Sequence, residues 1–342
     1  MATTDPRLRR DAPAESSPAR GRVSPWDALR GVGSTILQRY ALLVALVVLV
    51  AFFSILRPES FFTTANLAST LGIQASLTLL AIGVTIALLV GEFDLSAASV
   101  MGVSAGVVAY LTKVEGFSVP AAVAVVVVAG AVIGLITAFF VVKVGIHSFI
   151  VTLGMGTLVT GAALGLAGTA TIGGIPDTLT GFFRADILGV EAAFFIMLAV
   201  AVIGWVLLQK MPLGRNIFFT GEASTAAALA GIRVNALRVG SLVASSVLAS
   251  LAGVMLVGQI GAASPTVAGP YLLPAYAAAF LGATAFTPGR FNVWGTVWAV
   301  YLLAVGTIGF QLLGFSGWVT EVFNGAVLVL AVTFSKIFGR QR

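Results

Sequence analysis

The sequence contains no cysteine and only one histidine, His147. Without thiols, the chain can form neither a disulfide nor a thiolate metal site. A single histidine with no other metal ligand nearby cannot supply a metal cluster, so we interpret His147 as structural. These absences exclude disulfide-stabilised scaffolds and metal centres built on histidine and cysteine.

Charge is also scarce. Charged residues make up 9% of the chain and hydrophobic residues 58%, against roughly 25% and 45–50% in a soluble domain. This composition predicts an integral membrane protein. The net charge of +6 does not require a nucleic-acid partner, because many basic residues precede the first apolar block, as expected for a cytoplasmic segment beside a membrane span: Arg7, Arg9, Arg10, Arg20, Arg22, Arg30 and Arg39.

Motifs for nucleotide binding and catalysis are missing too. No glycine-rich phosphate-binding loop of the type Gly-x-x-x-x-Gly-Lys-Ser/Thr occurs, and no lysine follows a glycine. No nucleophile with a base, acid/base pair or metal set is visible. We therefore expect no enzymatic activity and no cofactor bound by this chain. If ATP drives the protein, MgATP must bind to a separate ATPase subunit.

Residues 1–39 and 40–342 differ in composition. Met1 to Arg39 is rich in Pro, Ser, Ala, Asp and Arg, which bury too little apolar surface to fold alone. We predict that residues 1–39 form a disordered, basic cytoplasmic tail and that residues 40–342 form the transmembrane domain.

Apolar blocks predict an all-α polytopic membrane protein with about ten transmembrane helices, since a span needs about 20 apolar residues. The expected spans are Tyr40–Ile55, Leu67–Val90, Ala97–Leu111, Val119–Val142, Phe149–Ala167, Ala192–Leu208, Val239–Val257, Tyr271–Phe286, Val293–Gly309 and Trp318–Phe334. With both termini in the cytoplasm, most basic loops fall inside and only Arg57, Lys113 and Arg184 fall outside. This asymmetry favours an even number of spans.

Glycine pairs at a four-residue step occur in three of these spans: Gly102 and Gly106, Gly130 and Gly134, and Gly161 and Gly165. Such spacing lets helix backbones approach closely in lipid. We interpret the pairs mainly as packing sites, with a pore-lining role as the alternative.

Two acidic residues, Glu92 and Asp94, fall between the second and third spans in Gly91-Glu-Phe-Asp-Leu-Ser. Carboxylates within a membrane are costly and indicate function. Asp94 or Ser96 before an apolar run is also typical of a helix N-cap. A proton-coupled secondary transporter, which needs a buried titrating group, remains an alternative at this point.

The longest basic interruption lies between the sixth and seventh spans, from Lys210 to Arg238. Within it, the alanine-rich run Glu222 to Ile232 predicts a short cytoplasmic helix, and Gly231 stands where a helix commonly ends. A soluble partner could push on such a helix.

Uncharged polar and aromatic residues provide further candidates for a solute path or for helix contacts: Gln74, Thr78, Thr152, Thr157, Gln259, Tyr276, Trp298 and Gln311.

Four ordered segments resemble permease subunits of bacterial ABC importers of the ribose, xylose and galactose type, which are related to branched-chain amino acid permeases. The resemblance covers Asn66 to the C-terminus. The segments are Gly91-Glu-Phe-Asp-Leu-Ser with Ser99-Val-Met; Ser148-Phe-Ile-Val-Thr-Leu-Gly; Gly214-Arg-Asn with Ala226-Ala-Ala-Leu-Ala-Gly-Ile; and Ala263-Ser-Pro-Thr with Gly289-Arg-Phe-Asn-Val-Trp-Gly-Thr.

The resemblance implies a type II-like importer in the bacterial cytoplasmic membrane. Two permease subunits, identical or paralogous, would form one path for a monosaccharide or polyol; two cytosolic ATPase subunits would dock on the coupling helices, and an extracytoplasmic binding protein would deliver the solute. The expected coupling residues are Glu222, Ala226, Ala227, Leu229, Gly231, Ile232 and Arg233, and the expected path residues are Gln74, Asp94, Ser96, Thr152 and Tyr276.

The chain departs from the family pattern where relatives commonly carry charged residues around the paired alanines, since it has Ser224, Thr225 and Ala228. It also has His147 where many relatives have proline, and an apolar Leu272 to Phe280. These departures leave open the choice of sugar, a nucleoside or branched-chain amino acid as substrate, and an unequal permease pair.

Overall fold

The computed structural model describes the backbone of residues 25–339 and the side chains of residues 40–333. The chain divides into one unit ending at Leu37 and a larger unit from Gln38 to Arg342. Helix α1 (Pro25–Leu56) begins inside the segment that we predicted to be a disordered tail. Proline is favoured in the first turn of a helix. Residues 1–24 of the predicted tail lie outside the described residues.

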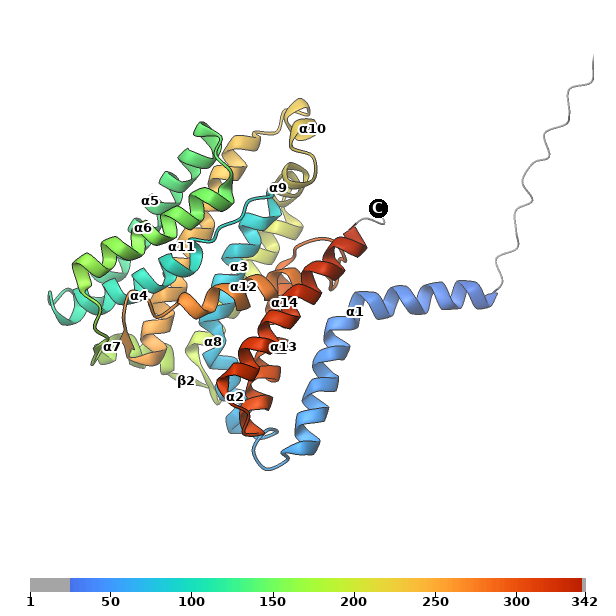
Figure 1. Ribbon diagram of the computed structural model, residues 1–342, viewed down its shortest axis with the longest axis horizontal. Helices are drawn as coiled ribbons and strands as arrows, with labels where there is room; N and C mark the ends of the chain where they lie inside the picture. Colours follow the sequence, from blue (N-terminus) through green and yellow to red (C-terminus); the bar gives the residue numbers. More distant parts are fainter. Residues whose placement is uncertain (1–24, 340–342) are drawn as a thin grey trace, which may run out of the picture. The chain divides into compact units, whose positions relative to one another are not determined.

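The rest of the described chain is helical, as the sequence predicts (Figure 1). Two antiparallel pairs of two-residue strands, β1 (Ile172–Gly173) with β4 (Ala262–Ala263) and β2 (Asp186–Ile187) with β3 (Val190–Glu191), only join loops. The helices are α2 (Thr64–Ile73), α3 (Ala75–Leu89), α4 (Ala97–Lys113), α5 (Val119–Ala138), η1 (Phe139–Val144), α6 (Ser148–Ala167), α7 (Asp177–Arg184), α8 (Ala192–Trp205), η2 (Val206–Lys210), α9 (Pro212–Glu222), α10 (Ser224–Leu229), α11 (Val234–Ile260), η3 (Gly269–Tyr271), α12 (Leu272–Gly282), α13 (Val293–Leu312) and α14 (Gly317–Gly339).

Five described helices are long and apolar enough to cross a membrane, or six if α2 and α3 form one broken span. Three shorter apolar helices cover Tyr40–Leu56, Ala97–Lys113 and Gly317–Thr333. Each of the ten predicted ranges overlaps a helix, but two predictions need correction. The second span is interrupted at Gln74, where α2 and α3 are bent by 41°. The eighth is only α12, whose 11 residues extend about 16 Å, well short of a hydrocarbon core of about 30 Å.

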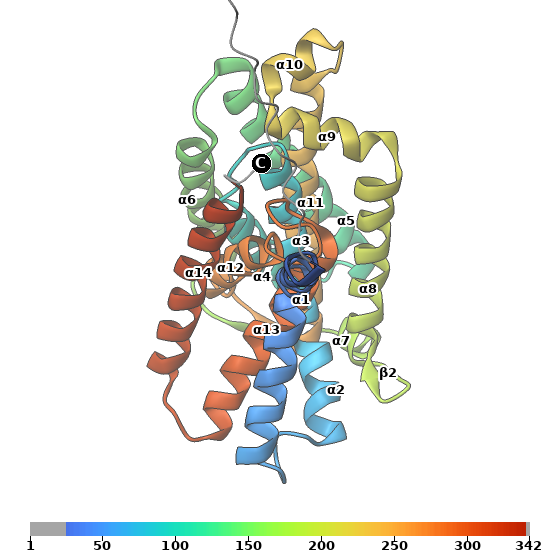
Figure 2. The ribbon, with the colours of Figure 1, turned by 90° about the vertical axis from the view of Figure 1, so that its right-hand side faces the viewer.

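Helix α11 lies at the centre of the larger unit and packs against α3, α4 and α5, while α12 packs against α13 and α14. Every residue of α3 except Ile86 is buried, which matches its largely apolar sequence. Helices α9 and α10 lie at one end of this unit, and α2 and α7 at the other (Figures 1 and 2). We call these the α10 end and the α2 end.

The three glycine pairs have different surroundings. A methyl group at Gly102 would lie 2.6 Å from the Pro265 carbonyl oxygen, so this pair packs on a loop backbone. A methyl group at Gly134 would lie 2.8 Å from Val243 of α11, as expected for close helix packing. At Gly161 and Gly165 it would meet no described atom within 4 Å, so packing within this chain does not explain the third pair.

Candidate functional site

The acidic loop, which we define as residues 90–96, joins the end of α3 to the start of α4 at the α10 end. Gly91 has a φ of +82°, a conformation that side chains disfavour, which explains a glycine at this turn. Glu92 and Asp94 follow it and are only 5% and 1% exposed. Two buried carboxyl groups thus lie three positions or fewer from a tight turn.

Asp94 is held by serines from two helices. One carboxylate oxygen accepts hydrogen bonds from the backbone N–H and the hydroxyl of Ser96, at the start of α4. The other accepts from the hydroxyl of Ser245 on α11, at 2.7 Å. Asp94 is thus not the N-cap of α4; it holds Ser96, the residue before the helix, and links the loop to α11, a contact that the sequence did not reveal. Ser96 itself is the N-cap residue, although its side chain makes no capping bond.

Helix α6 fixes the backbone of the same loop. The Ser148 hydroxyl accepts from the Phe93 N–H at 3.1 Å. One turn later, the Thr152 hydroxyl accepts from the Leu95 N–H at 3.1 Å. It lies 2.8 Å from the Ser148 carbonyl of its own helix and 3.2 Å from the Phe93 carbonyl, and its single hydrogen can be shared between these two acceptors. Residues four apart lie on the same face of a helix, so the hydroxyls of Ser148 and Thr152 both contact the backbone of the acidic loop. His147 caps this helix, its ring nitrogen accepting from the Phe149 N–H, in agreement with the structural role predicted for it.

Tyr276 on α12 completes the cluster. Its ring stacks on Phe93 with centroids 6.2 Å apart and planes inclined by 10°. Its hydroxyl is buried and has no hydrogen-bond partner within the described residues. The loop is thus enclosed by α4, α6, α11 and α12.

Four of the five predicted path residues, Asp94, Ser96, Thr152 and Tyr276, therefore come together. Gln74 does not join them, because it lies at the break between α2 and α3. Sequence reasoning missed two members as site residues. Ser148 could have been found from the sequence, because it begins one of the four segments that resemble the permease family. Ser245 had no distinguishing signal, because it is one of several serines on an apolar helix.

The predicted coupling helix is shorter than expected. Glu222 ends α9, Ala223 leaves the helical conformation with φ −151° and ψ 72°, and α10 covers only Ser224–Leu229. Gly231 ends α10 as predicted: its φ is +79°, its N–H bonds to the Ala228 carbonyl, and the next N–H bonds to the Ala227 carbonyl. This is the pattern of a Schellman C-cap.

The side chains of the predicted coupling set divide into an outer and an inner group. Leu229 is 87% exposed, and Glu222, Ala226 and Arg233 are also exposed. Ala227 is fully buried and Ile232 half-buried, so Ala227 anchors α10 to its own chain and offers no side chain to a partner. The outer group forms an exposed surface with a large apolar residue at its tip.

Two contacts connect the α9–α10 region to the acidic loop. A Cβ at Gly221 of α9 would overlap the Leu89 carbonyl at the end of α3, so the two backbones touch there. Arg238, in the second turn of α11, forms an ion pair with Glu92 at 2.5 Å. This is the only salt bridge among residues 40–333. The region that carries α10 is therefore fastened to the loop that holds Asp94.

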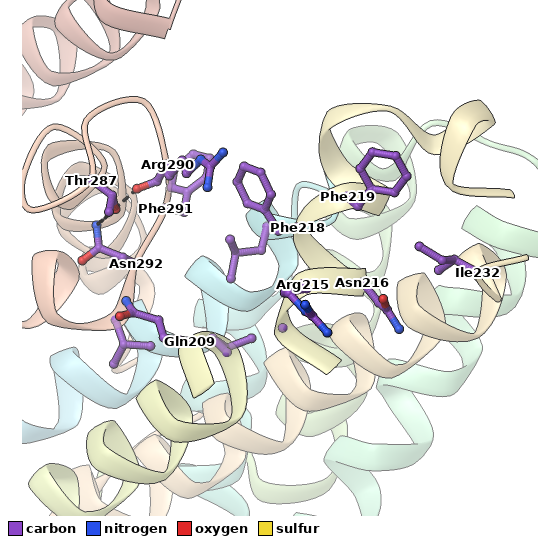
Figure 3. A pocket seen from close by; sticks show the side chains of 14 residues that line it. Gln209, Arg215, Asn216, Phe218, Phe219, Ile232, Thr287, Arg290, Phe291 and Asn292 are labelled. Atoms are coloured by element: carbon purple, nitrogen blue, oxygen red, sulfur yellow. Dashed lines mark hydrogen bonds between the residues drawn. The ribbon is translucent and has the colours of Figure 1, made fainter. Parts of the chain in front are cut away.

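Beside these contacts lies a groove of about 640 Å³ between α9 and the loop that precedes α13. It brings together two family-like segments, Gly214-Arg-Asn and Gly289-Arg-Phe-Asn. The Arg290 guanidinium stands over the Phe218 ring at 3.9 Å (Figure 3). The Asn292 amide donates to the Gly282 and Ala285 carbonyls and thereby closes the loop.

The chain is similar to known proteins over most of its length. Residues 66–332 match the family described as branched-chain amino acid transport system / permease component. The ribose import permease protein RbsC of Escherichia coli K12 is 33% identical over 85% of this chain and 91% of its own length. The D-allose transport system permease protein AlsC of the same strain is 31% identical over 89% and 93%. The autoinducer 2 import system permease protein LsrD of Salmonella paratyphi A is 27% identical over 86% and 91%. No solved structure matches the chain.

The family match covers most of the chain, including the acidic loop, α9, α10 and the groove. Its relatives are named as permease proteins of transport systems, which are non-enzymatic components. This polytopic, all-α membrane protein belongs to the branched-chain amino acid transport system / permease component family.

Proposed function

We propose that this chain is the permease subunit of an ATP-driven importer in a bacterial inner membrane, and that it conducts a monosaccharide or a related polyol. The relatives named for ribose and D-allose support a sugar. In this proposal the α10 end faces the cytoplasm, as the basic loops favour.

The observation that carries the proposal is the connection between the exposed surface of α10 and the acidic loop. Leu229, 87% exposed at the tip, suits burial in a partner, because a large apolar side chain gains most from leaving water. Motion imposed there reaches the acidic loop through the Gly221 backbone contact and the Arg238–Glu92 ion pair. A cytosolic ATPase that binds MgATP would supply that motion.

The remaining partners follow from the same architecture. A second permease subunit, identical or paralogous, would complete the path, and an extracytoplasmic binding protein would deliver the solute at the α2 end. Apolar side chains along α5 and α6 are exposed, among them Val128 at 62% and Ile150 at 66%. Lipid and the second subunit would cover such surfaces.

The test is uptake into vesicles that contain the permease, its ATPase and its binding protein, with labelled D-ribose and D-allose as probes. We expect uptake to require ATP on the side of the membrane that carries the ATPase. Uptake should stop when the catalytic carboxylate of the ATPase is neutralised. Uptake that persists with the inactive ATPase would overturn the proposal.

A second candidate, a proton-coupled carrier, is favoured by one observation: Asp94 is a fully buried carboxyl group near a possible path. It predicts that an uncoupler abolishes uptake at constant ATP and that Asp94→Asn removes proton coupling. The ATP-driven importer predicts that neither change alters the dependence of uptake on ATP.

A further inference from the structure

A cavity of about 200 Å³ lies at the α2 end, apart from the acidic loop. It forms where the α2–α3 break, the start of α12, the last half of α13 and the first turns of α14 meet. The lining side chains share one property, the absence of charge: Ile73, Gln74, Leu77, Pro270, Tyr271, Pro274, Leu303, Ala304, Thr307, Gln311, Thr320 and Asn324.

Several polar side chains around this cavity lack a hydrogen-bond partner among the described residues. The side chains of Gln74, Tyr271, Gln311 and Asn324 form no hydrogen bond with any described residue, and the Asn324 side-chain oxygen is buried. A buried polar atom without a partner costs free energy and is uncommon in folded proteins. The Asn324 oxygen is such an atom, whereas Gln74 and Tyr271 are half-buried and Gln311 is exposed. A ligand with hydrogen-bonding groups in the cavity would give the Asn324 oxygen its partner and would lie beside the unpaired Gln74 and Tyr271 side chains.

The backbone at Gln74 supports the same conclusion. Gln74 is both the C-cap residue of α2 and the N-cap residue of α3, and it lies at the 41° bend between them. The carbonyls freed by the break are satisfied from elsewhere, with Tyr301 donating to Leu71 at 3.1 Å and Gln259 to Gly72 at 2.7 Å. Interrupted helices in transporters commonly form solute sites where irregular backbone borders a cavity. Here the break is held open while the Gln74 side chain stays unpaired.

We propose that this cavity binds one molecule of the neutral, polyhydroxylated solute after its delivery at the α2 end; this rests on the function proposed above. Amide groups both donate and accept hydrogen bonds, as sugar hydroxyls do. Leu77, Leu303 and the Tyr271 ring offer apolar surface to the C–H faces of a sugar ring. The volume lies below the roughly 300–1,000 Å³ of sites for drug-sized ligands, as a single small ring requires.

The absence of charge in the lining separates this ligand from the alternatives. An amino acid is a zwitterion, and burying its ammonium and carboxylate without paired charges or strong hydrogen bonds is costly. The cavity therefore favours a sugar or polyol over a branched-chain amino acid, although the family name refers to the latter.

The first test uses the absence of native cysteine, which permits single-cysteine labelling without altering the background. Thr320→Cys places a thiol in the lining, and Ser316→Cys places one on the exposed loop nearby, outside the cavity. The full chain, assembled with its ATPase in nanodiscs, is treated with a maleimide in the presence of D-ribose, D-allose or L-leucine at saturating concentration. We expect the transported sugar to slow labelling of Thr320→Cys at least about threefold, with no effect on Ser316→Cys and none from leucine.

The second test measures transport. Asn324→Leu and Gln74→Leu keep approximate size and remove the amides, and we expect each to lower sugar uptake about tenfold while ATP hydrolysis by the assembled complex continues. Thr333→Val is the control, because Thr333 is exposed on α14, outside the cavity lining, and bonds only to the Val329 carbonyl of its own helix. It should import at the wild-type rate.

The outcomes distinguish the two proposals. If the wild-type complex imports sugar but both leucine variants import at its rate and no sugar protects Thr320→Cys, the cavity assignment is overturned and the importer function stands. If the wild type shows no ATP-dependent sugar uptake, the proposed function fails, and the assignment of the cavity fails with it.

Discussion

The ion pair between Glu92 and Arg238 allows a quantitative prediction. The Glu92 side chain is 7% exposed and that of Arg238 is 30% exposed, so loss of either partner has unequal consequences. Arg238→Gln leaves a buried carboxylate without its countercharge. Glu92→Gln leaves a guanidinium that can still reach water.

Breaking a buried ion pair by removing one partner costs about 3–5 kcal/mol. Because Arg238 is partly exposed, we expect Arg238→Gln to lower the free energy of unfolding by about 3 kcal/mol, the low end of that range. Glu92→Gln should cost about 1 kcal/mol, since only a hydrogen bond is weakened. The double variant should resemble Glu92→Gln, because it leaves no uncompensated charge.

The assay is reversible unfolding of the purified chain in mixed micelles, with a double-mutant cycle across the four proteins. Arg57→Gln is the matched control, because Arg57 follows α1, is exposed and has no acidic partner among the described residues. The same variants are then assayed for sugar molecules imported per ATP hydrolysed. If the two single substitutions add within about 0.5 kcal/mol, the residues are not coupled and the pair does not connect α11 to the acidic loop.

Three further substitutions test neighbouring contacts. Gly221→Ala should reduce coupled uptake strongly because its methyl group would overlap the carbonyl at the end of α3, whereas Gly240→Ala, on an open face of α11, should not; equal uptake by the two variants would contradict the contact. Ser245→Ala should lower the free energy of unfolding by about 1–3 kcal/mol through loss of its bond to a carboxylate. Ser241→Ala, which removes a buried hydroxyl without a described partner one turn earlier, should be neutral or stabilising, and an equal loss would refute the reasoning. Leu229→Gln should change stability by less than about 0.5 kcal/mol yet weaken ATPase binding about tenfold, measured by titration with the labelled ATPase.

The sequence predicted the membrane fold well, because scarcity of charge and long apolar blocks depend only on composition. It did not predict the break at Gln74, since alanine, serine and leucine around that position suit a continuous helix. The break is stabilised by Tyr301 and Gln259, whose side chains satisfy backbone carbonyls from far along the chain. Local propensity carries no information about such partners.

In the candidate site, too, the sequence predicted the local features but not the contacts between distant residues. The acidic loop was recognisable because carboxylates are costly beside a membrane, but the partners of its two carboxyl groups, Ser245 and Arg238, lie about 150 residues away in the sequence. Alanine content predicted one helix from Glu222 to Ile232. The helix is instead interrupted at Ala223, where the backbone of α9 has just met the end of α3. Tertiary contact thus overrode helix propensity.

Helix α3 joins the two regions that the proposals assign to solute and to energy. It begins at Gln74 beside the uncharged cavity and ends at Leu89, against α9 and next to the acidic loop. Its 15 residues extend about 22 Å, and nearly all of them are buried. A close-packed interior transmits displacement instead of absorbing it. A shift of α9 therefore has a direct route to Gln74 along one helix, and the break at its far end is the place where that shift can change the shape of the cavity.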